Sequence, residues 1–484
     1  MAQAQAQAAV DFPRPQAVDW DRFVAALDGI QTIREPALVK QKSRDFYWYS
    51  PILKEQLKSK FGDIVVLPRN VDEVVKVAAT CAKFRAPLVM RGGGTGNYGQ
   101  AMPLEGGVIL ETTLMDKILW RKHDVLRVQA GKKLIDIDAE LRPQGWEIRL
   151  HPSTKRTATV GGFIAGGSGG IGSVMWGVLR ERGQIHALKI VTVEETPRVI
   201  ELRGDEVQRA NHAYGTNGII VELEMPLGIA EPWVDVIVAF DDLRASLAFG
   251  QEVAETAPIV KKLVSTCAWP IPQYFRQLRE ACPEGKHIAI AMISETSMES
   301  FRRIVEIHGG RITYEKRLDE TDKAVPLYEY TWNHTTLQAL KVDRTVTYLQ
   351  TLFPFGSNID LMMHMHEKFG DEVMIHAEFV RIQGRITNSA LQIVRYTTPE
   401  RLFDIIAYHE KMNCRIANPH TFVLEDGGMK RIDKDQLAFK FEADPFGLLN
   451  PGKMRGWAEA HALGIRKAAD VGRVDWQTIG SERY

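Results

Sequence analysis

Two glycine-dense stretches constrain this chain more than any other feature of its sequence. The first covers residues 91–99 and reads RGGGTGNYG, and the second covers residues 159–172 and reads TVGGFIAGGSGGIG. Glycine allows the backbone to approach a bound group closely, and successive N–H groups in such a turn form a concave site for an anion. We therefore predict that the two stretches together cradle a diphosphate.

The first stretch differs from the two common phosphate-binding loops. Residues 87–90 and 108–110 are apolar, which predicts a short buried strand on either side of the loop. A Walker loop needs a Lys and a Ser or Thr at the start of a helix, and none follows here. Residues 94–99 match the dinucleotide pattern G-x-G-x-x-G, but Pro103 would stop the long helix that this pattern requires. We therefore reject a doubly wound dinucleotide-binding domain.

Four motifs in one order resemble the FAD-binding domain of the vanillyl-alcohol oxidase/p-cresol methylhydroxylase (PCMH) flavoproteins. They are PRNVDEV at 68–74, RGGGTGNYG at 91–99, PS at 152–153 with ATVGG at 158–162, and YGTNGII at 214–220. A weaker match, DPFGLLNPGK at 444–453, is similar to the return segment of the D-lactate dehydrogenase and glycolate oxidase FAD-subunit branch. The resemblance implies that the cofactor is FAD.

The resemblance also implies an α+β fold, in which a two-subdomain PCMH-type FAD-binding domain is joined to an α/β cap domain with an antiparallel sheet that binds the substrate. We expect an N-terminal lead segment at 1–57, the FAD-binding domain at 58–228, the cap domain at 229–435, and a C-terminal return segment at 436–484 that packs on the FAD domain. The residue pattern agrees, because its spacing predicts helices at 71–85, 243–255 and 298–308 and strands at 234–240 and 287–293.

The resemblance assigns cofactor binding to both glycine stretches and to short segments near them. These residues are Arg91, Gly92, Gly93, Gly94, Thr95, Gly96, Asn97, Tyr98, Gly99, Pro152, Ser153, Thr159, Val160, Gly161, Gly162, Ser168, Gly169, Gly172, Gly218, Ile219, Ile220 and Asn450. Members that link the flavin covalently use a His in the first loop or a Cys near the second. Thr95 stands at the first position and residues 151–186 contain no Cys. We therefore expect non-covalent FAD, with a link through a cap-domain His or Tyr left open.

Candidates for proton transfer lie in the expected cap domain. If residues 327–334 form a strand, then Tyr328, Tyr330, Trp332 and His334 share one face. A neutral His, with an ordinary pKa near 6.5, can take a hydroxyl proton at neutral pH. Tyr330 could do so only if its pKa, about 10 when unperturbed, were lowered. Core or solvated positions explain any one of these residues equally well.

A second group of candidates follows in residues 370–378, which read GDEVMIHAE. His376 and Glu378 would share a strand face as an acid–base couple, and Arg381 could hold a substrate carboxylate, although strand alternation turns it to the opposite face. His420, just before the return segment, is another candidate base. The resembled branch carries a Gly-Asp-Gly-Asn-x-His motif that binds zinc or manganese, but its glycine–asparagine part is missing here. His376 and Glu378 could still ligate a divalent ion, yet with the motif broken we predict no metal.

The composition of the chain limits the binding partners and the cellular compartment that we expect for the protein. The 61 basic and 61 acidic residues cancel, so no overall field attracts nucleic acid. The four cysteines form no C-x-x-C motif, which favours reduced thiols in the cytoplasm. No apolar run approaches the about 18 residues of a membrane span, and the first residues lack a signal-peptide pattern. We expect a cytoplasmic protein with a small-molecule substrate and an electron acceptor that is oxygen or a redox partner, and we leave a homodimer open.

These observations predict an FAD-linked oxidase or dehydrogenase that moves a hydride from a hydroxyl-bearing carbon to the flavin, with a 2-hydroxy acid as the substrate class. One alternative is a para-phenolic alcohol oxidase of the vanillyl-alcohol oxidase type, which the tyrosine and tryptophan stripe favours. Another is a catalytically silent flavin-binding protein, and a third is a redox-neutral use of FAD, as in alkyl-glycerone-phosphate synthases.

Overall fold

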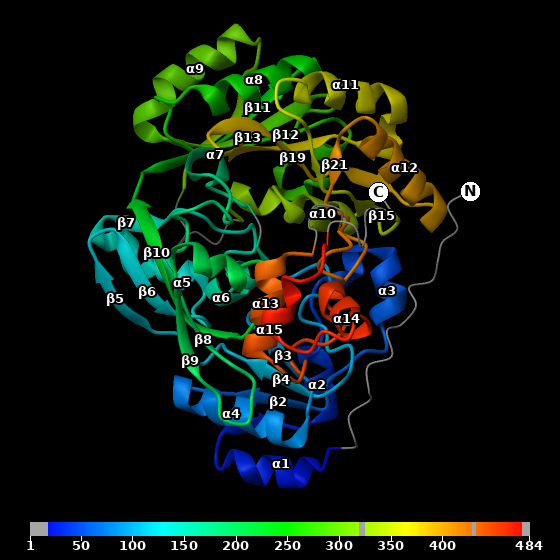
Figure 1. Cartoon of the computed structure of the whole chain (residues 1–484). Coiled ribbons are helices and arrows are strands. Elements are labelled where there is room, and N and C mark those ends of the chain that lie inside the picture. The colour runs from blue at the N-terminus through cyan, green and yellow to red at the C-terminus, as the bar shows by residue number, and fades with distance from the viewer. Residues whose placement is uncertain (1–17, 168, 319–324, 428–431, 477–484) are drawn as a thin grey trace.

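The computed structural model describes residues 18–167, 169–318, 325–427 and 432–476. In this part of the chain, helices surround four β-sheets. Figure 1 shows the largest sheet at the top of the molecule and two of the smaller sheets below it. The mixture of helices and largely antiparallel sheets confirms the α+β fold class predicted from the sequence.

The first sheet presents the first glycine stretch at one of its edges. Its strands, in sheet order, are β1 (Gln31–Ile33), β2 (Ile64–Leu67), β4 (Val108–Glu111) and β3 (Leu88–Arg91). β2, β4 and β3 run parallel, and β1 pairs antiparallel with β2. Because β3 ends at Arg91, the glycines that follow it leave the sheet at the carboxyl end of this strand.

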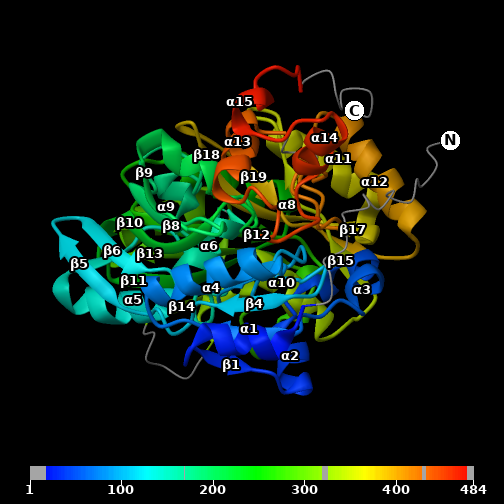
Figure 2. The ribbon, with the colours of Figure 1, turned by 60° about the horizontal axis from the view of Figure 1, so that its bottom comes forward.

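Helix α4 (Val71–Phe84) covers the first sheet and confirms the helix predicted there. The Asn70 side chain caps it by accepting a hydrogen bond from the Glu73 N–H at 2.9 Å. Val74, Ala78 and Cys81 are fully buried, as the apolar face of an amphipathic helix should be. Figure 2 shows α4 next to β4, with α1 (Trp20–Leu27) packed below it.

The second sheet is antiparallel around one long strand, β10. Its strands, in sheet order, are β5 (Ile118–Lys122), β6 (Val125–Gln129), β10 (Ile219–Ile229), β8 (Ala187–Val191) and β9 (Val199–Arg203), and β7 (Trp146–Ile148) pairs with the far end of β10. The apolar core of this sheet includes residues of three helices, α5 (Leu134–Leu141), α6 (Val160–Gly166) and α13 (Lys434–Ala443). The second glycine stretch, which contains α6, is thereby fixed against this sheet.

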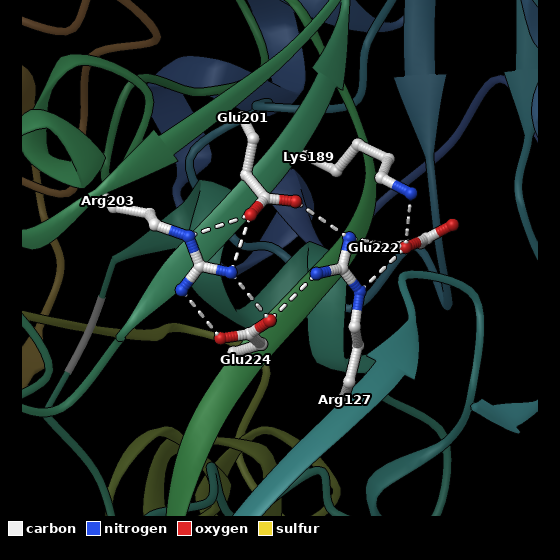
Figure 3. A network of polar contacts seen from close by, with 6 residues as sticks. All are labelled: Arg127, Lys189, Glu201, Arg203, Glu222 and Glu224. Atoms are coloured by element: carbon white, nitrogen blue, oxygen red, sulfur yellow. Dashed lines mark hydrogen bonds and ion pairs between the residues drawn. The ribbon is translucent and has the colours of Figure 1, made fainter. Parts of the chain in front are cut away.

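Four strands of the second sheet carry a network of charged side chains (Figure 3). Its six members are Arg127, Lys189, Glu201, Arg203, Glu222 and Glu224. Arg127 lies at the centre and donates to Glu222 at 2.8 Å, to Glu224 at 2.7 Å and to Glu201 at 2.9 Å. Opposite charges thus face one another across the neighbouring strands β6 and β10, which stabilises their pairing, and Glu201 joins them from β9.

The third sheet is antiparallel throughout and confirms the sheet expected for the cap. Its strands, in sheet order, are β14 (Arg311–Arg317), β11 (Trp233–Phe240), β13 (His287–Ser294), β12 (Lys261–Cys267), β18 (His376–Ile382), β19 (Arg385–Ala390), β16 (Thr351–Leu352) and β21 (Arg415–Ile416). Helices α8 (Leu243–Glu255) and α9 (Met298–Ile307) pack on its outer face, at the top of Figure 1. Both helices, β11 and β13 were predicted from residue spacing.

The remaining elements complete the layers. A small antiparallel sheet contains β15 (Val346–Tyr348), β20 (Ile393–Arg395) and β17 (Val373–Met374). The other α-helices are α2 (Pro36–Lys42), α3 (Pro51–Leu57), α7 (Ser173–Trp176), α10 (Asn333–Leu340), α11 (Asn358–Phe369), α12 (Pro399–Lys411), α14 (Arg455–Ala462) and α15 (Ala468–Val471). No helix among the described residues is both long and apolar enough to span a bilayer.

Residues 327–334 do not form the strand that would place Tyr328, Tyr330, Trp332 and His334 on one face. A 3-10 helix covers Leu327–Tyr330, and α10 starts at Asn333. Two threonine hydroxyls close this turn structure, because Thr331 Oγ1 donates to the Tyr328 carbonyl at 2.9 Å and Thr335 Oγ1 donates to the Tyr330 carbonyl at 2.6 Å. The alternating aromatic residues are buried here without a strand.

The C-terminal part of the chain returns to the first sheet. The Leu88 N–H donates to the Leu448 carbonyl at 2.8 Å, and the Asn450 N–H donates to the Leu88 carbonyl at 2.7 Å. Residues 448–450 therefore lie beside β3 as a short parallel bridge. The domain boundaries predicted at 57/58, 228/229 and 435/436 stay a prediction.

Candidate functional site

One cavity of about 400 Å³ lies where the two glycine stretches meet the inner face of the third sheet. We call residues 91–99 the first glycine loop and residues 159–172 the second glycine loop. The cap side of the cavity wall comes from the start of α10 and from β16, β18 and β19. Residues from widely separated parts of the sequence therefore enclose one space.

The two glycine loops touch each other, and this contact requires glycine in the first loop. A Cβ atom at Gly92 would overlap the Thr159 hydroxyl, and one at Gly93 would overlap the Thr157 carbonyl oxygen. Thr159 also caps α6, since its Oγ1 accepts the Gly162 N–H at 3.3 Å. Side chains at Gly92 or Gly93 would push the loops apart.

Arg91 braces the first glycine loop from inside. Its guanidinium donates to the Arg44 carbonyl at 2.7 Å and lies 3.8 Å from the Glu111 carboxylate. It also fills the space where a Gly94 side chain would project. Burial lowers the pKa of Arg91, which the charges of Glu111 and Asp45 oppose. A guanidinium so held keeps its charge beside the loop.

The N-terminal region grips the same loop. The Phe46 N–H donates to the Gly96 carbonyl at 2.6 Å, and Asp45 accepts the Ala101 N–H at 3.2 Å. Burial raises the pKa of Asp45 to about 6, against the lowering effect of Lys453. Phe46 thus holds the first glycine loop at Gly96, and Asp45 holds the segment that follows it at Ala101.

The return segment grips the loop from the other side. The buried Lys453 ammonium donates to the Gly99 carbonyl. Asn450 donates its side-chain N–H groups to the Gln100 carbonyl at 2.9 Å and to the Tyr214 carbonyl at 2.5 Å. Burial lowers the pKa of Lys453 to about 7, while Asp45 acts to raise it. Asn450 therefore holds Gln100 and Tyr214, which line the cavity, without lining the cavity itself.

Most of the residues predicted to bind the cofactor line this cavity. They are Arg91, Gly92, Gly93, Gly94, Thr95, Gly96, Asn97, Tyr98, Pro152, Ser153, Thr159, Gly161, Gly162, Gly169, Gly218 and Ile220. Five others lie behind the wall, namely Gly99, Val160, Gly172, Ile219 and Asn450. Ser168 lies outside the described residues.

Trp332, Asn333 and His334 form the part of the wall that lies at the start of α10. Each has a buried polar atom without a hydrogen-bond partner among the described residues: Trp332 Nε1, Asn333 Oδ1 and His334 Nδ1. Burial lowers the pKa of His334 to about 4, and the charge of Lys341 adds to the shift. His334 is therefore neutral at ordinary pH, which is the form that can accept a proton.

His376 and Glu378 meet as predicted but do not line the cavity. His376 Nε2 lies 2.8 Å from Glu378 Oε1, on one face of β18, and both side chains are fully buried. Ser265 Oγ donates to the same Glu378 oxygen at 3.0 Å. A ligand in the cavity cannot touch this couple, and no three His, Cys, Asp or Glu side chains of the described residues gather as metal ligands.

The other predicted catalytic residues also lie behind the wall. Both ring nitrogens of His420 are occupied, by Ser50 Oγ at 2.8 Å and by the Tyr348 carbonyl at 3.0 Å. Tyr330 donates to Gln277 at 2.8 Å, and burial raises its pKa to about 12, opposite to what a base requires. The prediction of Tyr330 as a base is therefore not kept.

Arg381 lies on the opposite face of β18 from His376 and Glu378, as strand alternation predicted. Its guanidinium donates to the Gly384 carbonyl at 3.0 Å and to the Val174 carbonyl at 3.3 Å. It lines a separate cavity of about 320 Å³ near Arg385. Arg381 is therefore unavailable to a substrate in the glycine-lined cavity.

Several wall residues were missed by sequence reasoning. Val380 and Ile382 follow Glu378 at the two-residue period of β18, so the strand pattern could have found them. Leu352 and Ser389 come from β16 and β19, and no local pattern marks them. Their place in the wall follows only from strand pairing.

The residues of this cavity fit FAD. Where the two loops touch, glycines expose backbone at the cavity wall, and side chains at these positions would not fit. A wall of backbone suits the close approach of a diphosphate. Arg91 supplies a positive charge beside the same loop. The orphaned polar atoms of Trp332, Asn333 and His334 are of the kind that a bound molecule or water satisfies.

Comparisons with known proteins agree with this site. Residues 62–201 match the family model for an FAD binding domain. Glycolate oxidase subunit GlcD of Bacillus subtilis (strain 168) is 28% identical over 206 residues, which are 42% of this chain and 43% of the relative. D-lactate dehydrogenase of Anaerostipes hadrus is 29% identical over 262 residues, which are 54% of this chain and 50% of the relative. The matches thus span half or less of these relatives.

A solved alkyldihydroxyacetonephosphate synthase has a similar fold. The TM-score is 0.69, the similarity covers 92% of this chain and 86% of that chain, and the sequences are 15% identical. At this identity the likeness concerns the fold alone. The glycine motifs and the family model agree with each other: residues 62–201 carry an FAD-binding domain, and FAD is its cofactor.

Proposed function

We propose that this protein is an FAD-linked oxidoreductase that removes a hydride from a hydroxyl-bearing carbon, and that its substrate is a 2-hydroxy acid. The observation that carries the proposal is the single cavity bounded by the two glycine loops on one side and by His334 and the cap sheet on the other. The relatives named for glycolate and D-lactate support the substrate class, because both compounds are 2-hydroxy acids.

His334 is the residue that we assign to proton removal. It lies in the cavity wall, and burial keeps its imidazole neutral. A neutral imidazole within hydrogen-bond reach of a substrate hydroxyl takes its proton as the hydride leaves the same carbon. FAD, when bound, accepts that hydride. Asn333, next to His334, offers an amide group that orients the substrate.

Aliphatic side chains of the cap sheet keep water away from this reaction. Val380, Ile382 and Leu352 all line the cavity. An apolar wall strengthens the polar contacts within the site and limits side reactions with water. The same wall favours a second candidate substrate, an alcohol with a neutral apolar body, because such a body packs against aliphatic side chains.

Anaerobic reduction of the bound flavin tests the proposal. Protein loaded with FAD is mixed with D-lactate, glycolate or D-2-hydroxyglutarate, and the flavin absorbance is followed, with dithionite as the positive control. We expect at least one of the three acids to bleach the flavin within the time of the assay. If only neutral aliphatic or aryl alcohols bleach the flavin, the substrate is a neutral alcohol and not a 2-hydroxy acid. Bleaching by dithionite but by no alcohol or acid would leave a silent or redox-neutral flavoprotein.

A further inference from the structure

A buried polar cluster lies directly behind the cavity wall. Glu378 is its centre, and the other members are His376, Ser265, Thr335 and the backbone of Trp332. The four side chains that belong to it have no exposed surface. Buried polar groups are costly unless they are bonded, so this cluster needs a structural or functional reason.

Hydrogen positions in the cluster follow from its geometry. His376 Nδ1 lies 3.1 Å from the Leu391 carbonyl oxygen, which can only accept, so Nδ1 carries a hydrogen. The 2.8 Å contact between His376 Nε2 and Glu378 Oε1 also needs a hydrogen between the two atoms. The contact between His376 and Glu378 therefore holds Oε1 in a fixed direction.

The same oxygen accepts the Trp332 N–H at 2.7 Å. The Trp332 backbone has φ 51° and ψ −140°. A bulky residue rarely takes a positive φ, and such strain persists only when the surroundings impose it. The bond from Trp332 to Glu378 is placed where it can impose this conformation.

The strained residue carries the cavity wall. Trp332, Asn333 and His334 line the cavity in succession. The indole of Trp332 packs on the second glycine loop so closely that a Cβ at Gly169 would lie 2.8 Å from its ring. A relaxed backbone at Trp332 would therefore move the indole and the ring of His334 relative to the glycine loops.

We propose that Glu378, braced by His376 and Ser265, is a positioning residue that holds Trp332 in its strained conformation and thereby fixes the Trp332–His334 turn in the cavity wall. It does so without touching the contents of the cavity. Its effect on turnover rests on the function proposed above, whereas its effect on the backbone does not.

A double-mutant cycle tests this role through thermal unfolding of the FAD-loaded protein. Glycine takes a positive φ without strain, so Trp332→Gly removes what Glu378 is proposed to hold. We expect Glu378→Gln to lower the Tm of the otherwise unchanged protein, and to lower it by less than half as much in the Trp332→Gly background. Equal Tm shifts in both backgrounds would overturn the proposal.

Two further variants keep the cycle interpretable. Ser265→Ala removes one hydrogen bond to Glu378. It takes the place of Glu378→Gln in the cycle if Glu378→Gln does not fold. We expect the same coupling to Trp332→Gly, with a smaller Tm shift. Thr387→Val is the matched control, because the Thr387 hydroxyl is equally buried in the same sheet and donates to the Phe353 carbonyl at 2.7 Å. Its Tm shift should be the same in both backgrounds.

Spectra and kinetics separate positioning from mere stability. Glu378→Gln should change the visible circular dichroism of the bound flavin and lower kcat by about 10- to 100-fold with a smaller change in KM, while Thr387→Val changes neither. An unchanged flavin spectrum in Glu378→Gln would contradict the proposal. If the wild-type protein oxidises none of the alcohols but the Tm coupling holds, only the proposed function fails. If the protein turns over and the Tm shifts are additive, only this inference fails.

Discussion

Three buried histidines of this protein differ in role because their neighbours differ. His420 has a partner on each ring nitrogen and joins Ser50 to β15. His376 is bound into the cluster around Glu378. His334 lines the cavity and has no partner at Nδ1 among the described residues. The sequence identified all three as candidate bases, but the choice depends on atoms that come from distant segments.

Replacement of His334 by Gln tests its assignment as the base. Gln keeps a polar group in the wall but cannot take up a proton, so we expect kcat to fall by about 100- to 10,000-fold. FAD binding, measured by titration of the apoprotein, should change little. His308→Gln is the control, because His308 contacts Glu252 on the outer helices, away from the cavity. A His334→Gln variant with unchanged kcat would exclude this assignment.

At the scale of elements, the first glycine loop depends on contacts from both ends of the chain. Asp45 and Phe46 hold it from one side, and Asn450 and Lys453 hold it from the other. Glycine density alone predicted that this loop approaches the second one. The grip by the N-terminal region was not predicted, because nothing in residues 44–46 marks them as partners of a loop so far along the chain.

Gly93→Ala should separate the two glycine loops. The added methyl group would overlap the Thr157 carbonyl, and backbone cannot move aside as a flexible side chain can. We expect FAD affinity to fall by at least about 10-fold, which corresponds to about 1.4 kcal/mol. Gly228→Ala is the control, since its methyl group would meet neighbours at an ordinary 3.6 Å outside the cavity. Equal FAD affinities of the two variants would refute the loop contact.

Some elements could be predicted from sequence and others could not. The helix at 243–255 was predicted with its observed bounds, because residue spacing is a local signal, and in the structure the Asp242 side chain caps it. For residues 327–334 the sequence left strand and helix open, because alternating aromatic residues fit a strand, whereas in the structure threonine hydroxyls close turns there. The parts of the cavity wall made by Leu352 and Ser389 follow from strand pairing, which a single sequence does not reveal.

At the scale of the whole molecule, buried titratable groups link packing to pH. Burial lowers the pKa of both His334 and His420 to about 4. In the unfolded chain these histidines take up protons below about pH 6.5, whereas in the folded protein they stay neutral until about pH 4. The unfolded state therefore binds more protons in this window, and stability falls as the pH drops through it. Asp45, with its raised pKa of about 6, acts in the opposite direction.

His420→Gln isolates one of these contributions. We expect the free energy of unfolding of the wild-type protein to fall between pH 6.5 and pH 4 by more than that of His420→Gln, with a difference on the order of 3 kcal/mol. Denaturant unfolding at a series of pH values measures both curves. The variant should be less stable at pH 6.5, because it loses the bonds to Ser50 and Tyr348. Parallel curves would show that His420 does not titrate as its burial requires.

The bridge between Leu88 and residues 448–450 has a consequence for biosynthesis. A ribosome releases the first glycine loop long before it makes Asn450 and Lys453, which complete the grip on that loop. A nascent chain therefore lacks the completed binding site for the flavin nucleotide until residues 450–453 have left the ribosome. Loading with the coenzyme then follows the synthesis of this segment rather than that of the glycine loop itself.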